Sequence, residues 1–143
     1  MSLPFSRSWS SITVNSSGRF VAIAQSTNSV IYSDDGITWQ SSSLPTSANW
    51  ISITVNLSGR FVAVATSSNN VAYSDNGINW TLVTLLSSTS WVSITVDIYG
   101  RFVIISSNPN EAITAYSDNG INWNYKNIQN GSSFDWVAVI NTT

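Results

Sequence analysis

Carboxylates are the main side chains in this sequence that could act as catalytic acids or bind a hard cation, and they are few. The 143 residues contain seven Asp and Glu, no His and no Cys. Asp34, Asp75 and Asp118 lie in three similar stretches, which read YSDDGITW, YSDNGINW and YSDNGINW. A calcium ion takes about six to eight oxygen ligands, but only one carboxylate is common to the stretches. We therefore expect these aspartates to shape a turn, and we predict neither a metal site nor a catalytic residue.

The lack of His and Cys excludes several other kinds of site. It removes thiol nucleophiles, disulfides, the usual zinc ligands and the commonest general base. Charged residues make up 8% of the chain and its net charge is −2, so no basic surface for nucleic acid is expected. No stretch approaches the roughly 18 apolar residues of a membrane span, and no signal peptide is seen. We expect a soluble protein without cofactor or membrane partner, and the sequence predicts no compartment.

The chain is a tandem repeat. Its units open at Trp9, Trp50 and Trp91, which are 41 residues apart. Between 9–39 and 50–80, 22 of 31 residues are identical. We treat residues 1–143 as a single repeat domain. Its units occupy 9–49, 50–90 and 91–135, and a fourth opening, WVAVINTT, fills 136–143.

Each unit contains four short runs with the pattern of β-strands. In the second unit they read SITVN, RFVAVA, VAYS and WTLVT. The first run alternates apolar and polar residues, and the second is nearly all apolar, as expected of a strand covered on both faces. A Ser-Gly turn, the polar segment TSSNN and an Asn-Gly turn separate them. Four antiparallel strands in about 40 residues is the size of a propeller blade, so the sequence predicts an all-β protein of about three blades and one extra strand.

The stretch after the third strand resembles the Asp-box, or BNR, repeat of sialidase-type β-propellers, usually written S-x-D-x-G-x-T-W. The resemblance implies that this stretch joins the third and fourth strands of a blade. The box is one residue shorter here, and either Asp34 or Asp35 could take the aspartate's place. We expect the glycine to adopt positive φ, the Asp or Asn before it to hydrogen-bond the turn backbone, and the final Trp to pack between blades. The expected structural residues are Asp34, Gly36, Trp39, Asp75, Gly77, Trp80, Asp118, Gly120 and Trp123.

The resemblance also raises the hypothesis of a sialidase-like glycoside hydrolase. Sialidases bind the substrate carboxylate with three arginines, and this chain repeats Arg19, Arg60 and Arg101 after the first turn of each unit. One position copied three times favours pairing with a nearby box carboxylate, or capping of carbonyl groups, over a shared anion site. The acids outside the boxes, Asp97, Glu111 and Asp135, do not make a catalytic set. We expect the fold without the activity, and we rank a hydrolase fragment last.

Variable loops are the expected place for a ligand. If the strands alternate in direction, the boxes and first turns share one rim, and the remaining loops share the other. Loops on a rigid scaffold commonly carry binding residues. This second rim would contain the segments TSSNN, SSSLPTSAN and LLSSTS. The residues expected to bind a ligand are Asn108, Asn110, Glu111, Tyr125 and Lys126. The alternative is that they are ordinary solvated loop residues.

Three blades do not close a propeller, which typically has four to eight. Either copies of the chain assemble into a ring, or the chain is part of a longer protein. We favour a homodimer of six blades, and a trimer would give nine. The strand at 136–143 could latch onto a neighbouring copy or belong to a further blade. We predict a non-catalytic module that self-assembles and serves as a scaffold or binds a glycan or protein, with a multivalent glycan-binding lectin as the alternative.

Overall fold

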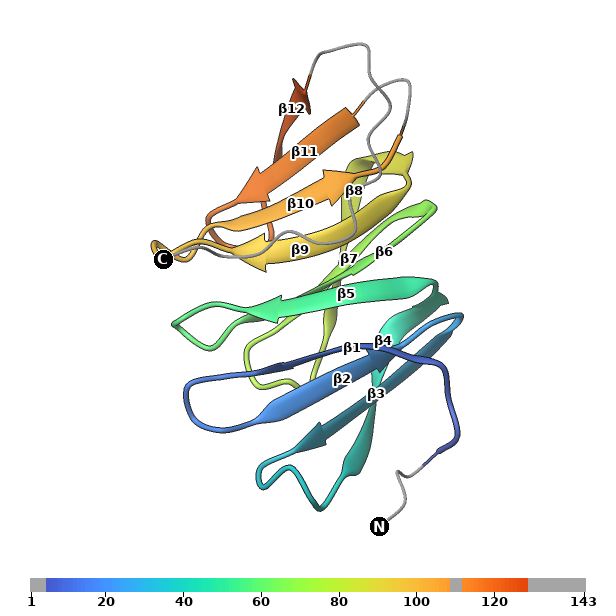
Figure 1. Ribbon diagram of the computed structural model, residues 1–143, viewed down its shortest axis with the longest axis vertical. Coiled ribbons are helices and arrows are strands. Elements are labelled where there is room, and N and C mark those ends of the chain that lie inside the picture. The colour runs from blue at the N-terminus through green and yellow to red at the C-terminus, as the bar shows by residue number, and fades with distance from the viewer. Residues whose placement is uncertain (1–4, 109–111, 129–143) are drawn as a thin grey trace.

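The computed structural model of the chain describes residues 5–108 and 112–128. Within these ranges twelve strands form three four-stranded sheets, stacked one on the next (Figure 1). The first sheet contains β1 (Trp9–Val14), β2 (Phe20–Ala24), β3 (Thr27–Ser33) and β4 (Gln40–Ala48). The second contains β5 (Trp50–Val55), β6 (Phe61–Ala65), β7 (Ser68–Ser74) and β8 (Thr81–Thr89). The third contains β9 (Trp91–Val96), β10 (Phe102–Ser106), β11 (Ala112–Ser117) and β12 (Asn124–Ile128).

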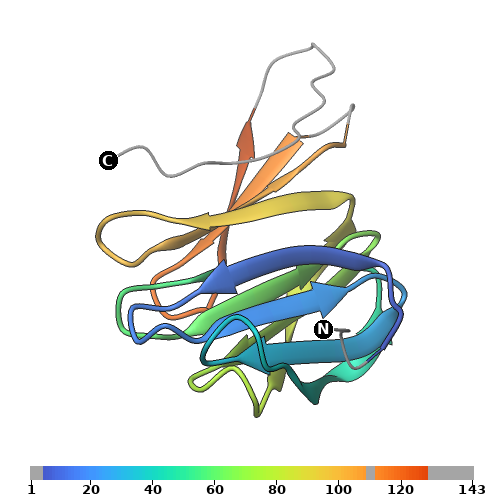
Figure 2. The ribbon, with the colours of Figure 1, turned by 60° about the horizontal axis from the view of Figure 1, so that its bottom comes forward.

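Each sheet is an antiparallel meander whose strands pair in chain order. The first strands of the sheets, β1, β5 and β9, lie side by side, whereas the last strands, β4 and β8, approach each other much less (Figures 1 and 2). Sheets that are close at their first strand and spread at their last are the consecutive blades of a β-propeller. The predicted fold class is therefore confirmed, and the extra strand predicted at 136–143 lies outside the described residues. No helix in the described ranges has the length and apolar character to cross a membrane.

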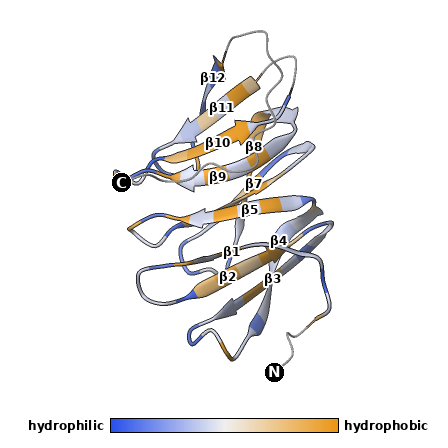
Figure 3. Ribbon diagram, viewed as in Figure 1, coloured by the Kyte–Doolittle hydropathy of each residue, from blue (hydrophilic) through white to orange (hydrophobic). Residues whose placement is uncertain are grey.

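The core lies between the sheets and not within any one of them. Every residue of β6 is fully buried because a blade covers each of its faces. Phe61 and Ala63 join the cluster shared with the first blade, and Val62 and Val64 join the cluster shared with the third. Figure 3 shows hydrophobic residues concentrated on β2, β5 and β10, with polar residues at the turns. The run RFVAVA is thus apolar because both faces of its strand are covered, as the sequence predicted.

The polar segment TSSNN, predicted as a loop, is mostly strand. β6 ends at Ala65 and β7 begins at Ser68, so the turn has two residues, Thr66 and Ser67. The φ angle of Ser67 is 53°, and that of the equivalent Ser26 is 55°. Two-residue hairpin turns use positive φ because it matches the right-handed twist of the strands. The sequence did not predict this two-residue turn because it contains no glycine.

The segments SSSLPTSAN and LLSSTS were also predicted as loops, and this prediction is wrong. β4 continues to Ala48 and β8 to Thr89, so a single residue connects each blade to the next. Leu44 and Leu85, each 2% exposed, fix these strands onto the cores between blades. Their pairing with the preceding strand shifts in register midway, which interrupts the alternation that would have revealed them. The variable rim is therefore smaller than predicted.

The tryptophans that open the blades are buried where another blade covers them. Trp50 and Trp91 are fully buried, whereas Trp9, in the first blade, is partly exposed. The indole Nε1 of Trp50 donates to the carbonyl oxygen of Thr46 at 3.1 Å, which ties the second blade to the last strand of the first. An opening tryptophan thus belongs to the junction between blades.

The box tryptophans of the second and third blades also pack at the junctions. Trp80 and Trp123 lie partly buried against the two cores. The ring centroid of Trp80 is 6.5 Å from that of Phe61, at an interplanar angle of 55°. This tilted contact is the arrangement that aromatic pairs prefer.

Replacing this indole tests the packing. We expect Trp80→Ala to lower the free energy of unfolding by about 3 kcal/mol, the low end for a buried Trp, because part of the side chain is solvated. Chemical denaturation measures the change. Leu86→Ala is the control, since Leu86 is 87% exposed and its loss should change stability by less than about 0.5 kcal/mol. Equal stability of Trp80→Ala and the parent would contradict the packing.

Candidate functional site

The three stretches that resemble an Asp-box, which we call boxes, form tight turns on one rim, between β3 and β4, β7 and β8, and β11 and β12. In the second box the buried Ser74 hydroxyl accepts the N–H of Gly77 at 2.8 Å and donates to Asn76 Oδ1 at 3.0 Å. Asn76 Oδ1 also accepts the N–H groups of Ile78 and Asn79, both at 2.9 Å. Three donors therefore converge on one side-chain oxygen and fix the turn.

The residue after the shared aspartate closes every box. Asp35 in the first box and Asn119 in the third accept the same pair of backbone bonds as Asn76. Aspartate and asparagine present the same acceptor oxygen, so their exchange preserves the turn. This position was missing from the predicted structural residues. The signal for it was the Asp-to-Asn exchange itself, because the two side chains share only the acceptor.

The shared aspartate binds an arginine of its own blade. Arg19 Nε and Nη2 donate to the carboxylate of Asp34 at 2.7 and 2.8 Å. Arg60 binds Asp75 in the same manner at 2.6 and 2.9 Å. The guanidinium of Arg19 also lies 5.4 Å from the ring centroid of Tyr32. The pairing predicted from the repeat is present in all three blades, so the arginines do not converge on a shared anion site.

These arginines also join neighbouring blades. Arg19 Nη1 donates to the carbonyl oxygen of Asn76 in the next box at 2.9 Å, and Arg60 Nη1 donates to that of Asn119 at 2.8 Å. The box glycine permits the approach, since a Cβ on Gly77 would lie 2.6 Å from a methyl carbon of Val21. The second and third boxes are thus held both by their own blade and by the preceding one.

Two arrangements lower the pKa values of rim carboxyls. The hydrogen bond from the paired guanidinium lowers the pKa of Asp34. The backbone N–H groups of Thr38 and Ile37, with the Ser33 hydroxyl, lower the pKa of Asp35 to about 2. Both groups are ionised near neutral pH and have no proton to donate as general acids. Within 5–108 and 112–128, no three His, Cys, Asp or Glu side chains are placed to hold a metal ion.

The predicted binding residues do not form one site within the described ranges. Asn110 and Glu111 lie outside those ranges, and Asn108 is half-buried after the end of β10. The hydroxyl of Tyr125 accepts the N–H of Leu86 at 2.8 Å, and its ring packs against the core between the second and third blades. Lys126, the next residue of β12, is exposed and points to the opposite face. Tyr125 is therefore a packing residue of the junction.

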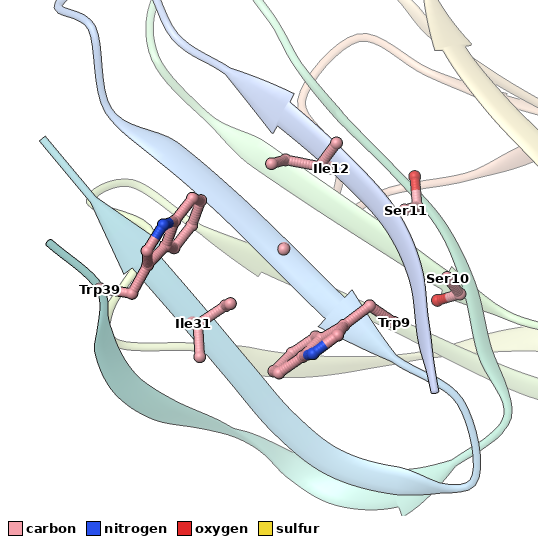
Figure 4. A pocket seen from close by; sticks show the side chains of 7 residues that line it. Trp9, Ser10, Ser11, Ile12, Ile31 and Trp39 are labelled. Carbon is pink, nitrogen blue, oxygen red and sulfur yellow. The ribbon is translucent and has the colours of Figure 1, made fainter. Parts of the chain in front are cut away.

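A hollow of about 350 Å³ lies on the outer face of the first blade. In Figure 4 the indoles of Trp9 and Trp39 flank it and the side chain of Ile31 lies between them. Its lining residues are Trp9, Ser10, Ser11, Ile12, Ala22, Ile31 and Trp39. The hollow is mainly apolar and carries no charged group.

A second hollow, of about 430 Å³, lies where the first turns of the three blades meet. It is lined by Val14, Asn15, Ser16, Val55, Asn56, Leu57, Val96, Asp97 and Ile98. The side-chain oxygens of Asn15, Asn56 and Asp97 accept backbone N–H groups of their own turns. The exposed apolar side chains of this hollow are those of Leu57, Ile98 and Val14, at 78%, 52% and 45% exposure.

Comparisons with known proteins give a fold and no family. No protein-family model matches the chain, and no curated protein matches it. Among solved structures it is similar to a virginiamycin B lyase from Staphylococcus aureus, with 17% identity and a TM-score of 0.74 over 88% of this chain and 43% of the lyase.

Two further similar structures are of YCF48. The first, from Cyanidioschyzon merolae, is 15% identical with a TM-score of 0.61, over 96% of this chain and 61% of YCF48. The other, bound to a D1 peptide, is 21% identical with a TM-score of 0.56, over 85% of this chain and 39% of YCF48. The chain thus spans less than two thirds of each neighbour's length. At these identities the likeness shows the fold alone.

Of the three turn-closing residues Asp35, Asn76 and Asn119, only Asp35 titrates, so this position contributes a pH dependence in the first box alone. A carboxyl whose pKa falls to about 2 on folding stabilises the protein above about pH 4 and loses that contribution as pH drops toward 2. Asp35→Asn keeps the acceptor and cannot be protonated in this range. Melting temperatures of parent and variant should therefore differ most near neutral pH and converge between pH 4 and 2. A difference that stays constant over that interval would contradict this role.

The crowding at the box glycine can be separated from its backbone strain. Gly77 and Gly59 have φ of 75° and 88°, so alanine at either position costs about 1 kcal/mol through backbone conformation alone. Nothing lies within 4 Å of a Cβ on Gly59, whereas a Cβ on Gly77 would meet Val21 of the neighbouring blade. We therefore expect Gly77→Ala to destabilise the protein more than Gly59→Ala in denaturation experiments. Equal losses would show that the blades move apart freely.

Proposed function

We propose that the chain is a non-catalytic β-propeller module that self-assembles through its blade faces and serves as a scaffold or binding module. We also propose that its three turns are shortened Asp-boxes with a structural role. Support for this role comes from the bonds that each turn makes to its own blade and, in the second and third blades, to the preceding one.

The open face of the first blade is the observation that carries the proposal. Ile12 is 56% exposed there, whereas its equivalents Ile53 and Ile94 are 5% and 4% exposed at the junctions. Trp9 is partly exposed for the same reason. An apolar face that is buried in one blade and open in its copy is stabilised by a further blade. Self-assembly supplies such a blade.

The charges of the rim support a role without catalysis. Each repeated arginine is bound to a carboxylate of its own blade, and two of them also donate to the next box. A substrate anion would have to displace these bonds. The groups are committed to the fold, and we assign them no part in chemistry.

Two ligand classes fit a binding role. One structural neighbour is described as bound to a D1 peptide, and the exposed Leu57 and Ile98 offer apolar anchors for a peptide at the first turns. The alternative is a multivalent glycan-binding lectin. The paired indoles of Trp9 and Trp39 favour it if the outer face of the first blade stays open in solution.

The mass of the protein in solution tests the proposal. We expect light scattering over a concentration series to give about twice the 15.5 kDa of one chain, because two copies would make a ring of six blades. A single-chain mass at every concentration would contradict self-assembly. Turnover of a fluorogenic sialoside by the assembled protein would contradict the non-catalytic part.

A further inference from the structure

The two junctions inside the chain repeat the same contacts. An arginine of one blade donates to a box carbonyl of the next, as in the bonds from Arg19 and Arg60. A valine packs into the space of the next box's glycine. The methyl carbon of Val62 would lie 2.8 Å from a Cβ on Gly120, close to the 2.6 Å separation of the first junction. A junction therefore has two halves, an arginine–valine half and a glycine–carbonyl half.

The first blade carries a glycine–carbonyl half without a partner blade. The three atoms nearest to a Cβ on Gly36 all belong to Phe20 of the same blade, at 3.4 to 3.9 Å. Gly36 is exposed, whereas Gly77 and Gly120 are buried by the preceding blade. The exposed Ile12 and the hollow beside Trp9 belong to the same face.

The third blade carries the matching arginine–valine half. The side chain of Arg101 is 48% exposed, against 25% for Arg19 and 24% for Arg60. It bonds to Asp118 through Nε at 2.8 Å, and among the described residues it makes no bond to a further box. Val103 is half-buried, whereas its equivalents in the other blades are fully buried.

We propose that these halves join two copies of the chain head to tail. Arg101 of each copy donates to the carbonyl oxygen of Asp35 in the other, and Val103 packs into the space at Gly36. The occupant is a second copy because this chain carries both halves, matched residue for residue to its own internal junctions. Such a heterologous contact made twice closes a ring, here of six blades. The inference rests on the proposed self-assembly and specifies its surface.

Ile12→Glu tests the face of the first blade. Burying a carboxylate in this apolar junction should weaken association at least about 100-fold, so the variant should have the mass of one chain where the parent is dimeric. The exposure of Ile12 should leave the fold intact, and circular dichroism checks this. Leu86→Glu, which also adds a carboxylate at an exposed leucine of a strand, should stay dimeric.

Disulfide trapping tests the register of the contact. The native chain has no cysteine. At the internal junctions, a Cβ built on the box glycine lies 2.6 to 2.8 Å from a methyl carbon of the facing valine. The β-carbons of the two residues are therefore near the roughly 4 Å separation of a disulfide. The double variant Gly36→Cys, Val103→Cys should form a covalent dimer on mild oxidation. Gly59→Cys with Val103→Cys is the negative control. Gly120→Cys with Val62→Cys is the positive control, because it should close a bond within one chain.

The outcomes separate this inference from the proposed function. If the unmodified protein has the mass of a single chain, both the proposed self-assembly and this inference are wrong. A dimeric parent with an equally dimeric Ile12→Glu variant leaves self-assembly standing and overturns the assigned surface. A covalent dimer of the single variant Gly36→Cys would reveal face-to-face pairing and also overturn it. A trapped dimer only in the Gly36 and Val103 pair supports the head-to-tail ring.

Discussion

A four-stranded sheet of this repeat has two apolar faces, and the need to bury both is the constraint on which the structure depends. β6 satisfies it completely, since each of its five residues is fully buried between neighbouring blades. The core consequently consists of two clusters at the junctions. A single blade has too little internal core to be stable alone, as is general for repeat proteins. The first blade leaves this constraint unmet in a single copy, because its Ile12 is 56% exposed.

Two of the ion pairs on the box rim stabilise this stacking. On the box rim, Arg19 and Arg60 each pair with a carboxylate of their own blade and donate to a carbonyl of the next. An isolated exposed ion pair contributes little to stability. Here the pair orients the guanidinium so that a third nitrogen reaches across the junction. The charge pair thus positions a contact between blades.

Two adjacent side chains in each box have different structural roles. The shared aspartate holds the arginine, and the following Asp35, Asn76 or Asn119 holds the turn. The sequence made the first role visible, because a carboxylate and an arginine recur together. The second role was predictable too, because an Asp or Asn directly before a turn glycine can hydrogen-bond the turn backbone, and the exchange between them keeps the acceptor.

Secondary structure was predictable where the pattern was local. The apolar run of β6 and the Asn-Gly turns correctly marked the strands and the connection between the third and fourth strand of a blade. The second halves of the long outer strands β4 and β8 were missed because a shifted register interrupts their alternation, and a leucine packed on the core between blades fixes them. The turn at Ser67 was missed because it takes positive φ without glycine.

The sequence by itself determined the repeat, the four strands of each blade and the pairing of the repeated arginine with its box. These depend on spacing and on contacts within one unit, which every copy of the unit carries. Only the tertiary structure decided which copies of a residue are buried. Ile12 and Ile53 stand at the same repeat position and differ in exposure, 56% against 5%, because burial depends on whether a neighbouring blade covers that face. Whether a neighbouring blade is present depends on how the blades stack, and the residue pattern of one unit does not contain this information.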